Sequence, residues 1–224
     1  MQGKFITFEG GEGAGKSTQA AMLALRLESY GLGVQLTREP GGSPGAEIIR
    51  HVLLTGAAKP LGADVEAMLF AAARDDHVQC TILPALRSGK WVICDRFVDS
   101  TRVYQGILGQ VDEKLINGLE RVSVGELSPD LTVILDLPVG LGLDRAKLRR
   151  GNIPADRFEG EDAEFHEKLR NAYLAIAARE PDRCVVVDAS GAKEVVANTI
   201  WEVVQSRLQP PALRRLDEAA TAKA

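Results

Sequence analysis

The chain has 224 residues, a formal net charge of −4, 45% hydrophobic residues and 26% charged residues. This composition is typical of a soluble globular protein with one α/β domain, and the acidic balance argues against a general nucleic-acid partner. No apolar run approaches the roughly 20 residues that cross a bilayer. No signal-peptide pattern opens the chain, so we expect a cytoplasmic protein with no membrane partner.

The most informative stretch is a glycine-rich loop near the start of the chain. The apolar run 5–8 leads into GGEGAGKS at 10–17, which fits G-x-x-x-x-G-K-[ST] and precedes a helix-forming stretch. In this motif glycine N–H groups surround phosphate oxygens, the lysine reaches the β- and γ-phosphates, and the serine hydroxyl binds Mg²⁺. The predicted ATP-phosphate residues are Gly10, Gly11, Glu12, Gly13, Ala14, Gly15, Lys16, Ser17 and Thr18.

Apolar runs and turn residues predict strands that alternate with helices. The expected strands are 4–9, 34–37, 91–94, 131–135 and 184–187. The expected helices are 16–30, 46–54, 65–86, a polar helix after Arg96, and 113–127, 140–150, 164–180 and 194–208. This order predicts an α/β fold of the three-layer P-loop NTPase type, with a five-stranded parallel sheet and helices on both faces. We expect one domain over 1–208 and a flexible tail over 209–224.

Within this plan, several local features carry their own expectations. Asp64 is expected to cap the long helix 65–86, and Pro84 to kink or end it. A cis Glu39–Pro40 bond is not favoured by the sequence alone. The cysteines Cys80, Cys94 and Cys184 are expected as buried small residues, and the histidines His51, His77 and His166 lack zinc-site spacing.

Charged residues follow two of the expected strands. Arg38 follows the second strand, and Asp95 and Arg96 follow the third. In an open parallel sheet this edge is where ligands bind, although a surface arginine and a structural ion pair are the ordinary alternatives. Farther along, Ser100, Thr101 and Tyr104 have the helical spacing that places them toward one pocket.

Two further patterns have both an ordinary and a functional interpretation. Phe70 and Arg74 share one helix face, where spacing alone favours a core aromatic over a ligand platform. The segment 145–160 is basic at first, is broken by glycine and proline, and ends in acidic residues. It is either a solvated charged hairpin or a small lid that brings arginines to a transferring phosphate.

Together these segments resemble the bacterial thymidylate kinases, over residues 1 to about 208. The matching segments are FEGGEGAGKST (8–18), TREPGG (37–42), MLFAAAR (68–74), DRFVDSTRVYQG (95–106), PDL (129–131) and the RR-G…DRFE lid (149–159). The resemblance implies transfer of the γ-phosphate of ATP to thymidine monophosphate (dTMP) with Mg²⁺, for dTTP synthesis, by an enzyme that is usually a homodimer. The helices expected at 65–83 and 113–127 are candidates for the dimer surface.

The resemblance also implies residue roles. Arg38 and Arg96 would bind the acceptor phosphate, Phe70 would stack on thymine, and Arg74 would bond a base oxygen. Glu12 would lie near the acceptor sugar and phosphate. The implied acceptor-binding set is Glu9, Arg38, Phe70, Arg74, Arg96, Ser100, Thr101, Tyr104, Gln105 and Glu159. The implied metal ligands are Ser17 and Asp95, and Arg145 joins the ATP-binding set.

Phosphoryl transfer needs a cation at the transferring phosphate, which an arginine supplies in many such enzymes. Positions 11–14 of the glycine loop hold no arginine, whereas the lid holds several. The predicted catalytic set is therefore Lys16, Arg96, Asp95, Glu12, Arg149 as first choice in the lid and Arg150 as second.

The alternative functions are another nucleoside monophosphate or deoxynucleoside kinase, or a GTPase switch. The N/T-K-x-D motif of guanine-binding switches is missing from the sequence.

Overall fold

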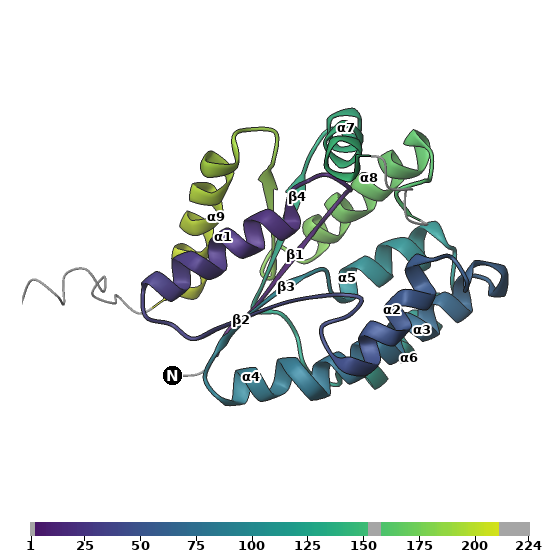
Figure 1. The fold of residues 1–224 in the computed structure, drawn as a ribbon, viewed down its shortest axis with the longest axis horizontal. Helices are drawn as coiled ribbons and strands as arrows, with labels where there is room; N and C mark the ends of the chain where they lie inside the picture. The colour runs from purple at the N-terminus through teal and green to yellow at the C-terminus, as the bar shows by residue number, and fades with distance from the viewer. Residues whose placement is uncertain (1–2, 152–157, 211–224) are drawn as a thin grey trace, which may run out of the picture.

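The computed structural model describes residues 3–151 and 158–210, and in this part of the chain a five-stranded parallel sheet runs through the centre (Figure 1). The strand order is β2-β3-β1-β4-β5. The strands are β1 Phe5–Gly10, β2 Val34–Arg38, β3 Trp91–Asp95, β4 Leu131–Asp136 and β5 Cys184–Asp188. Each ends one residue later than the sequence predicts, so Arg38 and Asp95 are the last residues of their strands.

Helices cover both faces of the sheet, which confirms the predicted three-layer fold. Helices α1 and α9 lie on one face, whereas α4, α5 and α8 lie on the other. The bounds are α1 Lys16–Ser29, α2 Pro44–Leu54, α3 Ala63–His77, α4 Leu83–Arg87, α5 Val98–Thr101, α6 Glu113–Val124, α7 Val139–Arg150, α8 Ala163–Arg179 and α9 Lys193–Leu208. A 3₁₀ turn, η1, spans Lys59–Leu61.

The two helix layers explain why the central strands are mostly apolar. Every residue of β1 is buried, and its side chains alternate between the two faces. Ile6 and Phe8 pack with α1 and α9, whereas Phe5 packs on the other side against Phe97, with ring centroids 4.9 Å apart. Each such buried side chain contributes about 1.5–3 kcal/mol to stability.

The long helix predicted over 65–86 differs from the structure in two ways. The N-cap is Gly62, and Asp64 lies inside the first turn of α3, so the predicted cap is wrong. A π-helical turn, η2 Val78–Ile82, separates α3 from α4, and Pro84 lies in the first turn of α4. Proline has no N–H to donate to the preceding turn, and a locally widened helix accommodates that missing bond.

Other local differences follow from single residues. Helix α6 ends at Val124 because Gly125 adopts φ 60°, three residues before the predicted end. The polar segment after Arg96 is a short α5 followed by a π-helical turn, η3 Arg102–Leu108. The Glu39–Pro40 bond is cis, contrary to expectation.

The predicted burial of cysteines is right at two positions and wrong at the third. Cys94 and Cys184 are buried in strands, whereas Cys80 is exposed on η2. All the histidines lie on helices, His77 and His166 buried and His51 exposed. Residues 152–157 of the predicted lid and 211–224 of the predicted tail lie outside the described residues. Within the described ranges, no helix has the length and apolar character needed to cross a membrane.

A buried ion network joins α5 to the amino end of β5. The Asp99 carboxylate is 1% exposed and accepts two hydrogen bonds from Arg183, at 2.7 and 3.0 Å. Arg183 also donates to Thr132 on β4 at 2.6 Å, and Arg102 donates to Asp99 at 3.2 Å. Removing one partner of a buried pair leaves the other charge without compensation, which costs more than the pair gains.

We therefore expect Arg183→Met to lower the free energy of unfolding by about 3 kcal/mol. Urea unfolding followed by circular dichroism measures this. The matched control is Arg179→Met, because Arg179 is an arginine on α8 whose side chain bonds a carbonyl of its own helix. A loss no larger than that of the control would contradict the assigned role of the network.

Candidate active site

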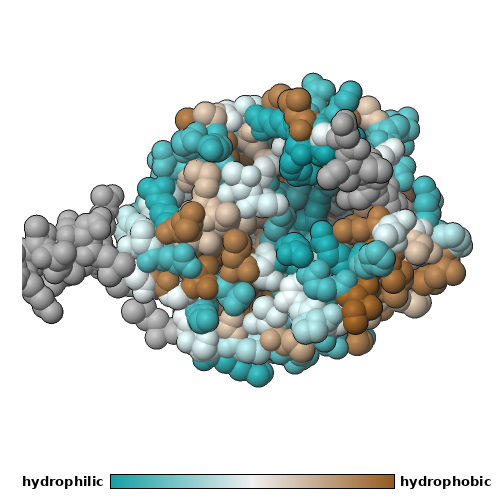
Figure 2. Space-filling model, in the orientation of Figure 1, coloured by the Kyte–Doolittle hydropathy of each residue, from teal (hydrophilic) through white to brown (hydrophobic). Residues whose placement is uncertain are grey.

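A cavity of about 290 Å³ opens at the carboxyl edge of the sheet, where the phosphate loop meets the ends of β2 and β3. Figure 2 shows its mouth as a hydrophilic hollow near the middle of the visible face. The described residues that line it are Glu12, Gly13, Gly15, Lys16, Ser17, Thr18, Arg38, Glu39, Pro40, Arg50, Leu54, Phe70, Arg74, Asp95, Arg96, Phe97, Ser100, Thr101, Tyr104, Gln105, Arg149, Phe158 and Glu159. Parallel strand ends converge here, as the sequence predicts.

The phosphate loop has the backbone that only glycine adopts without strain. Gly13 and Gly15 have φ of +69° and +91°, in the left-handed region. A Cβ on Gly13 would overlap the carbonyl oxygen of Gly142 on α7, so the loop also packs too closely for a side chain. Helix α1 begins at Lys16 without a side-chain cap, which leaves its first N–H groups directed toward an anion.

Lys16 is buried, and its ammonium is bonded within the loop itself. Its Nζ donates to the carbonyl oxygens of Gly10 at 3.1 Å and Gly11 at 2.7 Å. Burial lowers the pKa of Lys16, and the nearby positive charge of Arg96 lowers it further. A phosphate anion would stabilise the charged form and compensate the cost of burial.

Ser17 and Asp95 lie together where a metal-bound phosphate would lie. The Ser17 hydroxyl donates to one oxygen of Asp95, and the other oxygen of Asp95 is buried with no hydrogen-bond partner among the described residues. A buried carboxylate oxygen without a partner is costly, and a hard cation is a suitable ligand for it. These two residues therefore fit Mg²⁺, which takes few protein oxygens and keeps water and phosphate as its other ligands. Nowhere in the described ranges do three or more acidic, histidine or cysteine side chains form a metal-binding group.

Arg96 connects the phosphate loop to the polar helix after β3. Its φ is 71°, which is rare for a residue with a side chain. Its guanidinium donates to Glu12 at 2.5 Å and to Tyr173 at 3.2 Å, and it lies 5.3 Å from the centroid of the Tyr104 ring. Burial alone would raise the pKa of Glu12, but the positive charges of Arg96 and Lys16 lower it to about 2. Asp95 and Arg96 are thus bonded to other groups, and the structural ion pair between them is not formed.

One wall of the cavity is aromatic and ends in a buried arginine. The rings of Phe70 and Phe158 have centroids 6.2 Å apart, and Tyr104 contacts Phe158 at 5.2 Å. Arg74 is 3% exposed and donates to Glu39 at 2.8 Å and Thr101 at 2.9 Å. A flat ligand with a polar edge matches these walls in shape and chemistry.

The arginines of the predicted lid differ in position. Arg149 and Arg150 both bond Glu159, at 2.7 and 3.0 Å, but of the two only Arg149 lines the cavity. Arg145 points elsewhere: it donates to the carbonyl oxygens of Ala189 and Ser190 in the loop after β5, at 2.9 and 3.1 Å.

Most of the predicted site residues line the cavity, but some do not. Glu9, Gly10, Gly11, Ala14, Arg145 and Arg150 lie outside its lining, whereas Glu39, Pro40, Arg50, Leu54, Phe97 and Phe158 line it without having been singled out. Four of the latter are in quoted segments, because Glu39 and Pro40 belong to TREPGG, Phe97 to DRFVDSTRVYQG and Phe158 to DRFE. Tyr173, which bonds Arg96 from α8, has no sequence signal because it comes from a distant helix.

Glu9 lies behind the cavity and is fully buried. It accepts bonds from the Phe97 N–H at 2.7 Å, the Ser100 hydroxyl at 2.7 Å and the Tyr173 hydroxyl at 3.0 Å. Burial raises the pKa of Glu9 to about 7, and the negative charge of Asp99 contributes. The structure thus places Glu9 outside the cavity lining, where it holds Ser100 and Tyr173.

The comparisons with known proteins agree with one another. The family model described as thymidylate kinase matches residues 8–200. The chain is 60% identical to the thymidylate kinase of Bradyrhizobium sp. strain ORS 278, over 92% of each chain. It is 61% identical to that of Nitrobacter winogradskyi, over 92% of this chain and 90% of the relative.

The chain belongs to the thymidylate kinase family. A crystal structure of thymidylate kinase from Ehrlichia chaffeensis has a TM-score of 0.73 and 35% identity, and it covers 92% of this chain and 100% of that one. Membership of the thymidylate kinase family confirms the resemblance drawn from the sequence and disfavours both the GTPase switch and the other nucleotide kinases.

Glu9 gives the site a pH dependence of stability that can be measured. Because its pKa is about 7 in the folded chain and ordinarily about 4.5, the folded state binds a proton that the unfolded chain has released between these values. The stabilisation that this proton uptake by Glu9 gives the folded state is fully present below pH 4.5 and is lost as pH rises through 7. We expect the difference in unfolding free energy between wild type and Glu9→Gln to fall by about 3 kcal/mol across this window.

Denaturant unfolding at a series of pH values measures this difference. The matched control is Glu164→Gln on the exposed start of α8, which should give a curve parallel to wild type. Parallel curves for Glu9→Gln as well would show that Glu9 does not take up a proton on folding.

Proposed function

We propose that this chain transfers the γ-phosphate of ATP to dTMP, giving the diphosphate used for dTTP synthesis. The observation that carries the proposal is that one cavity contains two separate anion-binding groups. Lys16 and the loop around it form the first, and Arg38 and Arg96 at the ends of β2 and β3 form the second. A phosphoryl transferase must bring two polyanions together, whereas a switch protein needs to bind one.

The acceptor half of the cavity accounts for a nucleoside monophosphate. Arg38 and Arg96 bind its phosphate, Phe70 stacks on the base, and Arg74 donates to a base oxygen. Ser100, Thr101, Tyr104 and Gln105 line the cavity beside them, which supports contacts with base and sugar. Glu12, bonded to Arg96 and 3.3 Å from the Tyr104 hydroxyl, lies between the two anion sites.

The ATP half uses the phosphate loop, residues Gly10 to Thr18. The loop N–H groups surround the phosphates, and Lys16 exchanges its loop carbonyl partners for phosphate oxygens. Arg145, which bonds the carbonyl oxygens of Ala189 and Ser190 in the loop after β5, is the proposed contact of the ATP base. Ser17 and Asp95 would hold Mg²⁺, and the ion would supply positive charge to the phosphates of ATP.

In the reaction, an oxygen of the acceptor phosphate attacks the γ-phosphorus and ADP leaves. The protein contributes position and charge: Arg96 and Arg38 align the acceptor, and Lys16 neutralises the phosphates. Arg149 supplies the additional cation from the lid. Its side chain is 62% exposed and its partner Glu159 also bonds Arg150, so Arg149 can exchange Glu159 for a phosphate.

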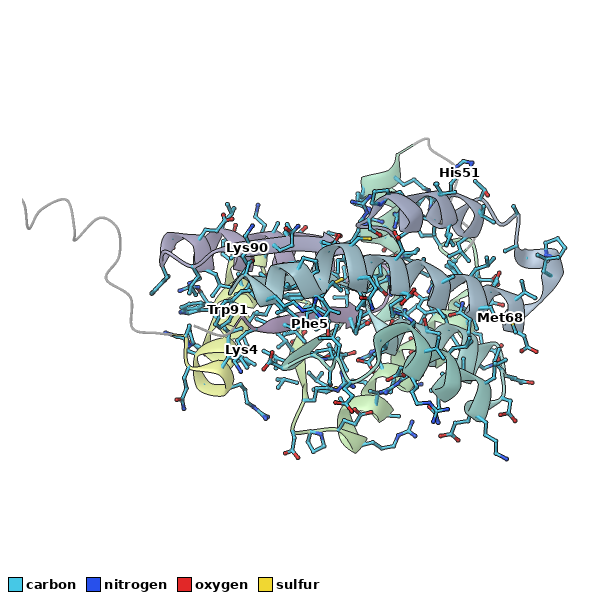
Figure 3. All side chains as sticks on the ribbon, turned by 90° about the horizontal axis from the view of Figure 1, so that it is seen from below. Lys4, Phe5, His51, Met68, Lys90 and Trp91 are labelled. Carbon is cyan, nitrogen blue, oxygen red and sulfur yellow. The ribbon has the colours of Figure 1, made fainter. Side chains whose placement is uncertain are left out.

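Association into a homodimer is part of the proposal. Exposed apolar side chains lie on α2, α3 and α6: Ile48 is 72% exposed, Met68 46% and Val122 79%. Figure 3 labels His51 on α2 and Met68 on α3, both at the end of the molecule far from Lys4 and Lys90, and Figure 2 shows hydrophobic surface over α2 and α3. Apolar surface on several adjoining helices is what a second copy would cover. A cytoplasmic location and a single catalytic domain ending near residue 208 complete the proposal.

Steady-state transfer from ATP–Mg²⁺ to a panel of nucleoside monophosphates tests the function. We expect dTMP to give the highest kcat/KM, ahead of uridylate, cytidylate and adenylate. Phe70 and Arg74 match a pyrimidine with a carbonyl oxygen where cytosine and adenine carry an amino group, so cytidylate and adenylate should rank lowest. The matched control is the Lys16→Met variant, which should neither bind ATP nor phosphorylate dTMP. Turnover of another monophosphate ahead of dTMP would assign a different acceptor.

The lid arginine is tested separately by alanine substitution. Arg149→Ala is expected to lower kcat at least tenfold with unchanged thermal unfolding, because an arginine at the transferring phosphate contributes about 10³–10⁵ in rate. Arg150→Ala is expected to have a smaller effect, and the exposed Lys147→Ala on the same turn none. Unchanged kcat in both arginine variants would contradict lid arginine catalysis.

A further inference from the structure

A buried chain of hydrogen bonds leads from β2 to the arginine at the end of the aromatic wall. Thr37 Oγ1 lies 2.7 Å from His77 Nε2, and His77 Nδ1 lies 3.1 Å from Glu39 Oε1. The other carboxylate oxygen of Glu39 accepts from Arg74 Nε at 2.8 Å. The side chains of His77, Glu39 and Arg74 are 0%, 5% and 3% exposed, so the bonds of Glu39 to His77 and Arg74 are shielded from bulk water, whereas the Thr37 side chain is half-buried.

The roles within this chain follow from the inventory of donors and acceptors. A carboxylate only accepts, so His77 Nδ1 carries the proton in its bond to Glu39. Nε2 then accepts from the Thr37 hydroxyl when the ring is neutral, and donates to it when the ring is charged. Thr37 therefore holds the imidazole plane in either state, and the imidazole holds one oxygen of Glu39.

At the far end, the guanidinium plane of Arg74 is held on two of its three nitrogens. Nε is bonded to Glu39, and Nη2 is bonded to Thr101 Oγ1 at 2.9 Å and the Phe97 carbonyl at 3.3 Å. Nη1 makes no hydrogen bond within the described residues, and Arg74 lines the cavity. The bonds thus leave one nitrogen, with two N–H donors, available to a ligand in the cavity.

The backbone of Gly42 closes the other end of the hydrogen-bond chain. Its φ is +86°, and a Cβ there would lie 2.5 Å from His77 Nε2 and also collide with Thr37 Oγ1. Gly42 is itself anchored, because its carbonyl accepts from Thr81 at 2.8 Å and its N–H donates to Glu47 at 2.9 Å. Only glycine leaves room for the Thr37–His77 bond at this position.

We propose that Thr37, His77 and Glu39 are positioning residues that orient Arg74, and that they thereby set the preference for a base with a carbonyl oxygen over one with an amino group. This rests on the proposed function, in which Arg74 contacts the acceptor base. Arg74 Nη1 can only donate, so it pairs with the carbonyl oxygen of thymine or uracil and opposes the amino group of cytosine. If the guanidinium of Arg74 were free to rotate, it would lose the bond to the carbonyl oxygen and would still gain no bond to the amino group of cytosine.

The test compares steady-state kinetics with dTMP and deoxycytidylate as acceptors. His77→Phe keeps a ring of similar size but removes both bonds, and we expect the KM for dTMP to rise about tenfold, the usual effect of losing one well-placed hydrogen bond. The KM for ATP and the kcat at saturation should stay within about twofold, and the dTMP over deoxycytidylate ratio of kcat/KM should fall about tenfold. A purely structural defect would change unfolding and the active fraction, and would not change one substrate's KM selectively.

A second pair of variants keeps the proposal testable if His77→Phe does not fold. Thr37→Val removes the hydroxyl at constant shape and should raise the KM for dTMP a few-fold, whereas Thr37→Ser should restore it. The matched control is Thr7→Val, which removes a hydroxyl bonded to Thr132 at 2.8 Å in the sheet core, away from Arg74. Equal KM values for Thr37→Val, Thr37→Ser and wild type would overturn the proposal.

A double-mutant cycle with Arg74→Met separates this inference from the proposed function. If the chain of bonds acts through Arg74, His77→Phe adds nothing to the KM of Arg74→Met. Additive effects would overturn the positioning role while leaving dTMP phosphorylation in place. An unchanged KM for dTMP in Arg74→Met would overturn base contact by Arg74, and the absence of dTMP turnover in wild type would overturn both.

Discussion

The ion pair between Arg96 and Glu12 is the contact on which the shape of the site depends. Glu12 lies inside the phosphate loop that follows β1 and Arg96 directly follows β3, so the 2.5 Å bond joins the ends of two neighbouring strands. Arg96 adopts a left-handed backbone, which costs roughly 1–3 kcal/mol and persists only because its partners hold it there. Ser100 and Tyr173 also accept bonds from Arg96, and both are in turn bonded to the buried Glu9.

Burial divides the charged groups of this protein into two kinds. Arg74, Arg96 and Lys16 lie where water is excluded, so each needs bonded partners, and each is held in one orientation by them. The lid arginine Arg149 is 62% exposed, so its ion pair contributes little and exchanges easily. The buried cations keep one orientation, which suits substrate binding. In the proposed reaction Arg149 must change partners, which its exposed position allows.

Much of the fold could be predicted because local pattern and global packing agree. The central strands β1, β3 and β4 are mostly apolar, as strands covered on both faces are, and their ends were predicted to within one residue. Predictions were weaker where one sequence pattern is compatible with two local structures. Asp64 resembles an N-cap, but Gly62 begins α3, and an apolar run across Pro84 does not reveal the π-helical turn before it.

The sequence by itself determined the phosphate loop, the alternation of strands and helices along the chain and the residues at the strand ends, because these depend on short segments whose chemistry is local. Only the tertiary structure decided which buried charges pair. Glu39 reaches Arg74 across 35 residues, Glu12 reaches Arg96 across 84, and Tyr173 reaches Glu9 across 164. Such partners come from separate elements that meet only when the sheet and its two helix layers pack. The spacing of residues along the chain therefore does not reveal which of them pair.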